Sequence, residues 1–183
     1  TYAANDMVAS LEQTIVEPDS GQTQARKQTF SLDGSDRIST IKDYTDNIQL
    51  SETLNHYDSD QDSPAWTQTK SRPNASTAWT TTWSRHVSDL MGSFAIDVNG
   101  VGNTILQLAN LHGDILATAT LGQVGINRYH ETDEYGNPFG ASPVARYGWL
   151  GTHQRDGGIV GGLTLMGARL YNSTTGRFLS IDR

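Results

Sequence analysis

The sequence predicts an all-β chain built from antiparallel hairpins. Turn-forming residues recur between short runs that contain apolar and β-branched side chains, at intervals of roughly 8–12 residues, a spacing typical of short strands. Glycine occurs 18 times in 183 residues, and hydrophobic residues make up 36% of the chain, against about 45–50% in an average globular domain. Strong helix formers do not gather in long runs, so we expect no helix longer than about three turns.

Charge and composition narrow the range of partners. The formal net charge is −7 and the isoelectric point is about 5.0, whereas binding to nucleic acid or to an anionic membrane needs basic patches. Cysteine is absent, which excludes disulfides within the chain and thiolate metal sites. No apolar stretch approaches the ~18 residues of a membrane span, and no signal peptide opens the sequence. Because Thr1 falls in the middle of a strand pattern, we expect a segment of a longer protein.

Strand–turn–strand patterns begin at the first residues. Asn5-Asp6 separates two short apolar runs, and Asp33-Gly34 is a strong hairpin turn pair. Residues 39–54 are rich in Thr, Ile and Ser, which are poor helix formers, so we predict a strand there. Residues 56–76 are the most polar part of the chain and are predicted to form a loop.

Three carboxylates in this polar loop have the spacing of a calcium-binding loop. Asp58, Asp60 and Asp62 stand at positions one, three and five of an EF-hand-like pattern. The pattern then fails, because Ser63 occupies the glycine position and Thr69 occupies the position of the bidentate glutamate. We therefore favour an acidic surface turn and keep a calcium site as the alternative.

Further strands are predicted in the second half. Thr residues separate the aromatic side chains of Trp79 and Trp83, which fits a sheet. Asn99-Gly100 and His112-Gly113 are turn signals between apolar runs.

The C-terminal part reads as one more hairpin. Apolar-rich runs at 163–171 and 177–181 flank a polar turn that ends in Thr175-Gly176. We expect three apolar residues of the second run to pack against three of the first. These residues are Phe178, Leu179 and Ile181 in the second run, and Leu163, Leu165 and Leu170 in the first.

The C-terminal blocks RYGWLG (146–151), GGLTLMGARLYN (161–172) and TGRFLSIDR (175–183) closely resemble the RHS repeat-associated core domain. The segment YHETDEYGNPFG (129–140) resembles the YD repeat of the same family. LANLHGDILATA (108–119) is similar to the segment just upstream of the core in actinobacterial-type members. In this family, β-hairpins wind into a spiral sheet that forms a hollow shell, and the core domain ends the spiral.

The resemblance implies two regions. Residues 1–125 would be a degenerate YD-repeat region, with the loop at about 56–76, and residues 126–183 would be the RHS core. In the family an Asp after the GRFLS strand is one of two that are implicated in self-cleavage, and Asp182 matches that position. Arg183 stands where the motif has Pro, so we expect no catalysis by this segment, which holds half of an aspartyl dyad. The alternative is that this segment forms part of an aspartyl autoprotease in the full-length protein.

The main functional hypothesis is a structural one. The resemblance implies the terminal wall and plug of an RHS-type shell that encloses or presents a polymorphic toxin, secreted or at the cell surface, without a cofactor. Its partners would then be the rest of the shell and the toxin. The alternative is an exposed YD-repeat sheet that binds carbohydrate or a cell-surface protein through aromatic side chains such as Trp79, Trp83 and Tyr147. Aromatic rings that face a cavity or core favour the shell, whereas an exposed aromatic surface favours binding.

Overall fold

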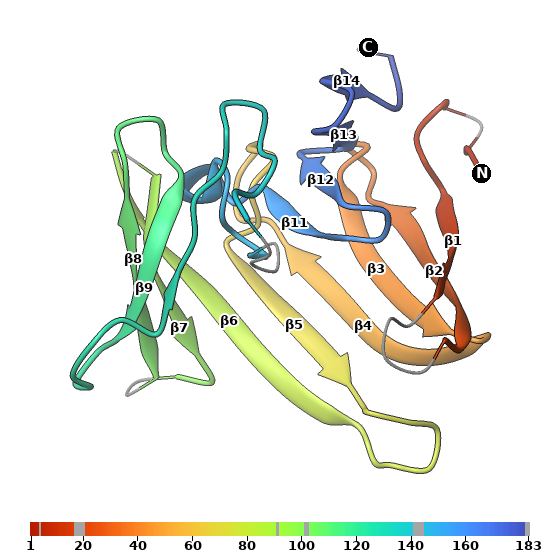
Figure 1. Ribbon diagram of the computed structural model, residues 1–183, viewed down its shortest axis with the longest axis horizontal. Coiled ribbons are helices and arrows are strands. Elements are labelled where there is room, and N and C mark those ends of the chain that lie inside the picture. The colour runs from red at the N-terminus through yellow and green to blue at the C-terminus, as the bar shows by residue number, and fades with distance from the viewer. Residues whose placement is uncertain (4, 17–20, 91, 101–102, 141–144, 182–183) are drawn as a thin grey trace.

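The computed structural model describes residues 1–183 except 4, 17–20, 91, 101–102, 141–144 and 182–183 (Figure 1). The all-β prediction is confirmed, since the strands form two antiparallel sheets of ten and four strands. The helical structure in the described part of the chain is one 3-10 turn, η1 (Gly151–His153). Hairpin connections dominate both sheets because sequential strands pair throughout.

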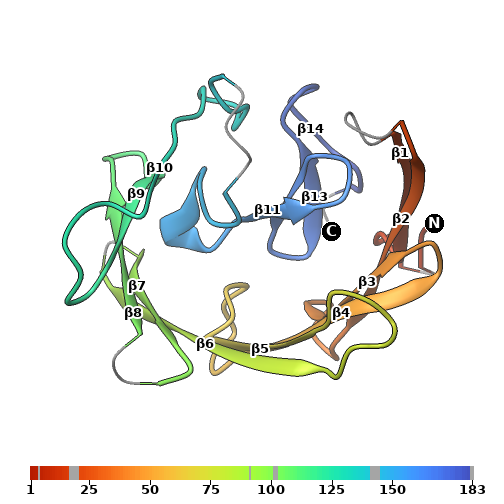
Figure 2. The same cartoon turned by 60° about the horizontal axis from the view of Figure 1, so that its bottom comes forward.

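The larger sheet contains ten strands in sequence order. They are β1 (Ser10–Val16), β2 (Thr23–Leu32), β3 (Ile38–Thr45), β4 (Ile48–His56), β5 (Trp66–Ser71), β6 (Thr80–Asp89), β7 (Gly92–Val98), β8 (Thr104–Ala109), β9 (Ile115–Thr120) and β10 (Arg128–Tyr129). The smaller sheet contains β11 (Asp156–Ile159), β12 (Leu163–Met166), β13 (Arg169–Asn172) and β14 (Arg177–Phe178). The larger sheet curves strongly, and the smaller sheet lies within its concave side (Figure 2).

The main core forms where the two sheets meet. Phe30, Ile38 and Ile41 on β2 and β3 cluster with buried side chains of the smaller sheet, including Leu165 and Leu170. The N-terminal segment also reaches the last strands, because the Tyr2 hydroxyl donates a hydrogen bond to the Leu179 carbonyl (3.0 Å). Neither sheet could bury these apolar side chains alone, so the small sheet is an integral part of the fold.

One turn design recurs in the hairpins. The turns at 33–37, 110–114 and 133–137 share a bond from the first N–H to the fifth carbonyl and another from the fourth N–H to the first carbonyl. In each, the first side chain is Asp or Asn and accepts hydrogen bonds from the third and fifth backbone N–H groups. The fourth residues have positive φ and are Asp36 (59°), Gly113 (92°) and Gly136 (88°). This is the three-residue hairpin loop with a left-handed residue at its end.

The four hairpin turns predicted from the sequence are present, with one difference in detail. Antiparallel pairing encloses the turns at Asn99-Gly100, His112-Gly113 and Thr175-Gly176. The turn at Asp33-Gly34 also joins two paired strands, β2 and β3. There, however, the left-handed residue is Asp36 and not Gly34, because the Asp33 carboxylate organises a five-residue turn around itself.

Three expected segments differ from the structure. The apolar run at 163–171, expected as one arm of a hairpin, is itself the hairpin of β12 and β13, which turns at Gly167 (φ 64°). The strand expected over 39–54 is a hairpin, because Asp46 and Asn47 both take positive φ (49° and 64°) in a two-residue turn. The loop expected over about 56–76 contains β5, whose Trp66 pairs with β4 and β6. The position 125 at which we expected the two regions to divide lies between β9 and β10, which are neighbours in one sheet.

The expected packing of the last apolar run is only partly present. Leu179 packs against the core, and its N–H donates to the Leu170 carbonyl (2.9 Å). Phe178 lies against the ring of Tyr171 (centroids 5.4 Å apart) and under the guanidinium of Arg169. The prediction for Ile181 is wrong, because this side chain is 68% exposed; β14 ends at Phe178, before the chain reaches it.

Replacing Leu170 with Ala should destabilise the protein strongly. Leu170 is 1% exposed at the centre of the core, and large-to-small changes at such sites cost about 2–5 kcal/mol. Urea unfolding should report this loss, while Ile181→Ala, a control at an exposed apolar position just beyond β14, should change the free energy of unfolding by less than about 0.5 kcal/mol. Equal effects of the two substitutions would contradict the packing described here.

Candidate functional site

The acidic residues identified from the sequence do not gather around one point. Asp58, Asp60 and Asp62 are all exposed, and the Asp62 carboxylate binds the Arg155 guanidinium (2.9 Å). Among the residues that the structure describes, no three His, Cys, Asp or Glu side chains are placed to hold a metal ion. Asp182, the expected half of an aspartyl dyad, lies outside the described residues.

Calcium at 1 mM should leave the unfolding midpoint of the protein unchanged. The Arg155 guanidinium already neutralises Asp62, which removes a carboxylate that an EF-hand-like site would need. A calcium site with a dissociation constant of about 10 μM would add about 2.7 kcal/mol by linkage at this concentration. Differential scanning calorimetry with calcium and with EDTA distinguishes the two cases, and magnesium serves as the control cation.

A polar cleft of about 360 Å³ lies between the concave face of β2–β5 and the segment that carries β11. Its floor consists of cross-strand neighbours, which are Gln28 opposite Asp43, Asp43 opposite Ser51, and Thr53 opposite Thr69. The two threonine hydroxyls are hydrogen-bonded to each other (3.0 Å). We call this space the inner cleft.

Gln28 fixes one end of the inner cleft. Its side-chain amide donates to the Asp43 carboxylate (2.6 Å), and its carbonyl oxygen accepts from the backbone N–H of Val160 (2.8 Å). The residue is buried, so these bonds satisfy a polar group that would otherwise be costly to bury. Sequence reasoning missed Gln28, because a glutamine between polar neighbours in a strand gives no signal of its partner 132 positions away.

Arg146 and Asp156 form the roof of the inner cleft. The Arg146 Nε donates to the Asp156 carboxylate (2.8 Å), whose other oxygen accepts from the Gly158 N–H (2.8 Å). The nearby negative charge of Asp156 raises the pKa of Arg146 above its usual range. One carboxylate oxygen therefore ties β11 to the preceding loop, and the other accepts a bond from within β11. Because both oxygens are engaged, the arrangement favours a structural role over general acid–base work.

His86 lies close enough to this ion pair to feel both of its charges. Its ring meets Tyr147 edge to face, with centroids 5.1 Å apart, and the residue is only 8% exposed. Burial lowers the pKa of His86 from 6.5 to about 4, and the positive charge of Arg146 adds to this effect while Asp156 opposes it. Burial also raises the pKa of Tyr147 to about 12. Of the three aromatic residues singled out from the sequence, Tyr147 thus faces the interior.

Stability should fall as the pH drops from 7 to 4.5. The folded protein resists protonation of His86, whereas the unfolded chain takes up the proton near pH 6.5, so stability is complete above 6.5 and is lost toward pH 4. The full loss is on the order of 3 kcal/mol. Carboxylates with a lowered pKa, such as Asp114, lose their contribution only below their ordinary value of 3.8.

Chemical unfolding of wild type and His86→Gln at both pH values measures this effect. The variant should show a smaller difference between the two pH values, though not zero, because burial also lowers the pKa of His130. Replacement of the exposed His153 with Gln is the matched control and should retain the wild-type difference. A His86→Gln variant with an unchanged pH dependence would contradict this role of His86.

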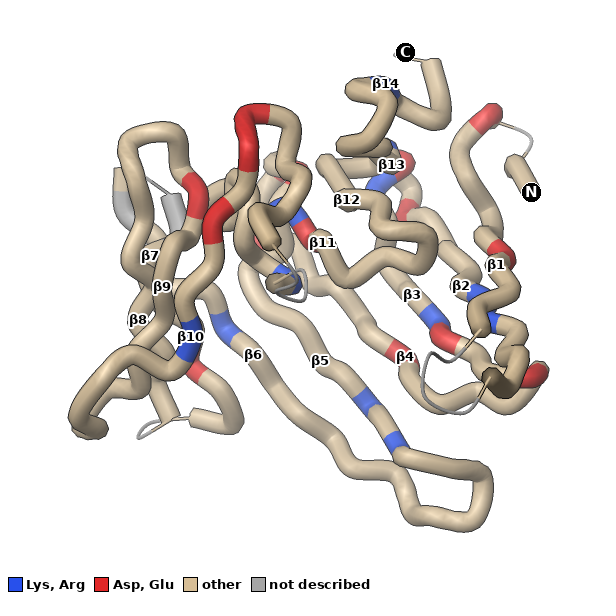
Figure 3. The backbone as a smooth tube through the Cα atoms, viewed as in Figure 1, with Lys and Arg blue, Asp and Glu red and all other residues tan. Residues whose placement is uncertain are grey.

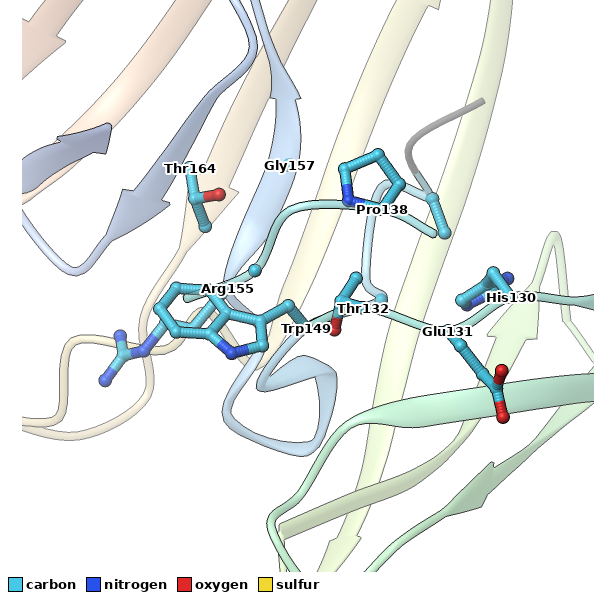
Figure 4. A pocket seen from close by; sticks show the side chains of 11 residues that line it. His130, Glu131, Thr132, Pro138, Trp149, Arg155, Gly157 and Thr164 are labelled. Carbon is cyan, nitrogen blue, oxygen red and sulfur yellow. The ribbon is translucent and has the colours of Figure 1, made fainter. Parts of the chain in front are cut away.

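A second cavity, of about 20 Å³, lies between the 129–139 segment and the smaller sheet. Figure 4 shows Trp149 and Arg155 on one side of it and His130 and Glu131 on the other. Trp149 stacks on Tyr171 (centroids 5.1 Å apart). The volume is about that of one water position, so this cavity is a packing feature and not a substrate site.

Aromatic side chains gather on the convex face of the larger sheet, opposite the buried His86. Trp83 is 44% exposed and lies 5.1 Å from Trp66, which stacks on His56 at 3.4 Å. Trp79 is 41% exposed and adjoins an open cleft of about 390 Å³. We call this space the outer cleft. Two of the aromatic residues identified from the sequence, Trp79 and Trp83, therefore face outward.

Comparisons with models of known protein families and with curated proteins found no match. Within the described parts of the chain, no helix has the length and apolar character needed to cross a bilayer. A function for this chain is therefore inferred from the arrangement of its sheets and from the chemistry of its two clefts.

Proposed function

We propose that this chain forms the terminal wall of an RHS-type β-shell, and that its four-stranded sheet acts as the plug. The observation that carries this proposal is the position of β11–β14 within the concave side of the ten-stranded sheet (Figure 2). Shared burial of Ile41 and Leu170 in one core joins the two sheets. An element that closes the end of a hollow shell has to pack against the inner face of its wall, as this terminal sheet does.

The linear strand order supports a wall that continues beyond this segment. Strands β1 to β10 follow one another as a meander, and within the described residues β1 pairs with β2 alone. A sheet edge of this kind exposes backbone N–H and C=O groups that readily pair with a further strand. In the proposal, the upstream part of the shell provides that strand at β1, and the toxin lies on the concave side.

The inner cleft supports a role in packing and enclosure. Its Asp156 carboxylate is hydrogen-bonded through both oxygens, and Gln28 links the two sheets. These bonds hold the plug in place and leave the chain itself non-catalytic in this proposal. The surface of the inner cleft around these bonds is mostly polar, which is compatible with contact to a solvated protein enclosed by the shell. In the proposal the shell itself is secreted or exposed at the cell surface.

The proposal is tested on the full natural protein that contains this segment. Cryo-electron microscopy should show a hollow shell whose wall enters the present sheet at β1 and ends at β11–β14. Hydrogen exchange provides a second measure. The outward-facing amides of β1 after Ser10, whose own N–H already donates to the Thr1 carbonyl (3.3 Å), should exchange slowly in the full protein and fast in the isolated segment. A full protein without a cavity, or with β1 amides that exchange equally fast in both forms, would overturn the proposal.

A further inference from the structure

The inner cleft has charged groups of opposite sign at its two ends. Arg128 of β10 and Asp43 of β3 both line the cleft, and these two strands stand on opposite sides of the concave face (Figure 3). Arg146 and Asp156 of the roof pair with each other (2.8 Å). Because that pair is neutral as a whole, the cleft retains a spare positive charge at Arg128 and a spare negative charge at Asp43.

Guanidinium groups supply unused donors at the positive end. Within the residues that the structure describes, Arg128 makes no hydrogen bond or ion pair, and its side chain is exposed. Arg146 donates through Nε to Asp156 (2.8 Å), while its two terminal nitrogens have no acceptor in the described part of the chain. The Arg146 side chain is 41% exposed, so a ligand can reach these nitrogens. Planar guanidinium donors fit a carboxylate, which accepts two of their hydrogen bonds at once.

Asp43 supplies an acceptor at the negative end. One oxygen of its carboxylate accepts from the Gln28 side-chain amide (2.6 Å), and Gln28 is itself bound to the Val160 N–H (2.8 Å). The second oxygen accepts no hydrogen bond from the described residues. An ammonium group suits this oxygen, because a hydrogen bond with charge on both partners is stronger than a neutral one. Since Gln28 already fixes the carboxylate, little conformational entropy is lost when a ligand binds.

Hydroxyl groups occupy the floor between the two charged ends, on β4 and β5. The Thr53 and Thr69 hydroxyls share one hydrogen bond (3.0 Å), so one hydroxyl hydrogen stays available for an acceptor on a ligand. Ser51 adds a third hydroxyl to the lining. Ile41 and Ile159 are its apolar members, and each is only 5% exposed. The cleft therefore offers little apolar surface to a large side chain.

We propose that the inner cleft binds a short zwitterionic peptide with small side chains. Its carboxylate accepts from Arg128 and from the terminal nitrogens of Arg146, and its ammonium group donates to Asp43. The amide group between these ends meets the hydroxyls of the floor, which both donate and accept. The volume of about 360 Å³ lies within the range of small-ligand sites. This assignment does not depend on whether the chain forms part of a shell.

Phosphate is the competing ligand class, because guanidinium groups also bind phosphate through two parallel hydrogen bonds. Asp43 and Asp156 belong to the same lining, and their charges repel a dianion that brings few donors of its own. The two arginines and two aspartates of the lining give it a formal charge of zero. A zwitterion, whose own charges also cancel, is therefore more complementary to the cleft than phosphate.

Titration calorimetry of the whole chain at pH 7 tests the site with dialanine, N-acetyl-dialanine, dialanine amide and inorganic phosphate. We expect dialanine to bind with a dissociation constant below about 1 mM. N-acetyl-dialanine lacks the ammonium group, and dialanine amide lacks the carboxylate. Each should bind about tenfold more weakly than dialanine, because each loses the charge-assisted hydrogen bonds at one end.

Two substitutions test the two ends separately. Arg128→Gln should weaken dialanine binding about tenfold and leave the affinity for dialanine amide unchanged, because that ligand has no carboxylate. Asp43→Asn retains an acceptor for Gln28; it should weaken dialanine binding by a similar factor and leave N-acetyl-dialanine binding unchanged. Arg85→Gln is the matched control. Arg85 is exposed and lies two positions after Trp83 in β6, so it shares the convex face.

Circular dichroism should show that each variant retains the strand content of the wild type. If one does not, the blocked peptides still test the same end of the cleft on the wild-type chain. Four results would overturn the proposal. These are no dialanine binding below about 1 mM, equal affinities for dialanine and its blocked forms, equal effects of Arg128→Gln and Arg85→Gln, and binding of phosphate alone.

Discussion

The apolar side chains on the concave face of the larger sheet have to be covered by another part of the chain. Most of the structure depends on how the smaller sheet provides this cover. Ten strands in meander order leave Phe30, Ile38 and Ile41 on a face that would otherwise meet water. At about 25 cal/mol per Å² of apolar surface, removing such side chains from water is the main stabilising term available to this chain. The C-terminal strands supply the cover with Leu165 and Leu170, so the beginning and the end of the chain fold as one unit.

Polar bonds determine where this cover sits, because apolar contacts alone carry little direction. Gln28 reaches from β2 to the backbone at Val160, and Arg146 ties the preceding loop to Asp156 at the start of β11. Removing one partner of such a bond leaves a buried polar group unsatisfied, which is costly. The inner cleft is the space that remains around these bonds, whereas the outer cleft lies on a face that the cover leaves free.

Sequence reasoning succeeded where the determinants are local. An Asp or Asn that accepts from its own turn, as at Asp33, forms a hairpin with no help from distant residues, and this is why the all-β class and the turns could be predicted. It failed at Asp46-Asn47, where two non-glycine residues take positive φ. The bonds of Gln28 and the packing of Ile181 depend on segments far away in the chain, so the pattern around each residue did not reveal them.

The turn at 133–137 couples two positions that are distant in sequence. Gly136 has φ of 88°, and a Cβ on it would lie 2.7 Å from atoms of the Trp149 ring. A side chain at this position would therefore meet both backbone strain and a rigid indole. A smaller side chain at position 149 would remove the clash but not the backbone strain at position 136. We therefore expect Gly136 to be replaced only where residue 149 is also smaller, whereas residue 149 can change while Gly136 remains. Sequence covariation between them would then report on how the smaller sheet is seated, because Trp149 stacks on Tyr171 of β13, although neither residue lines either cleft.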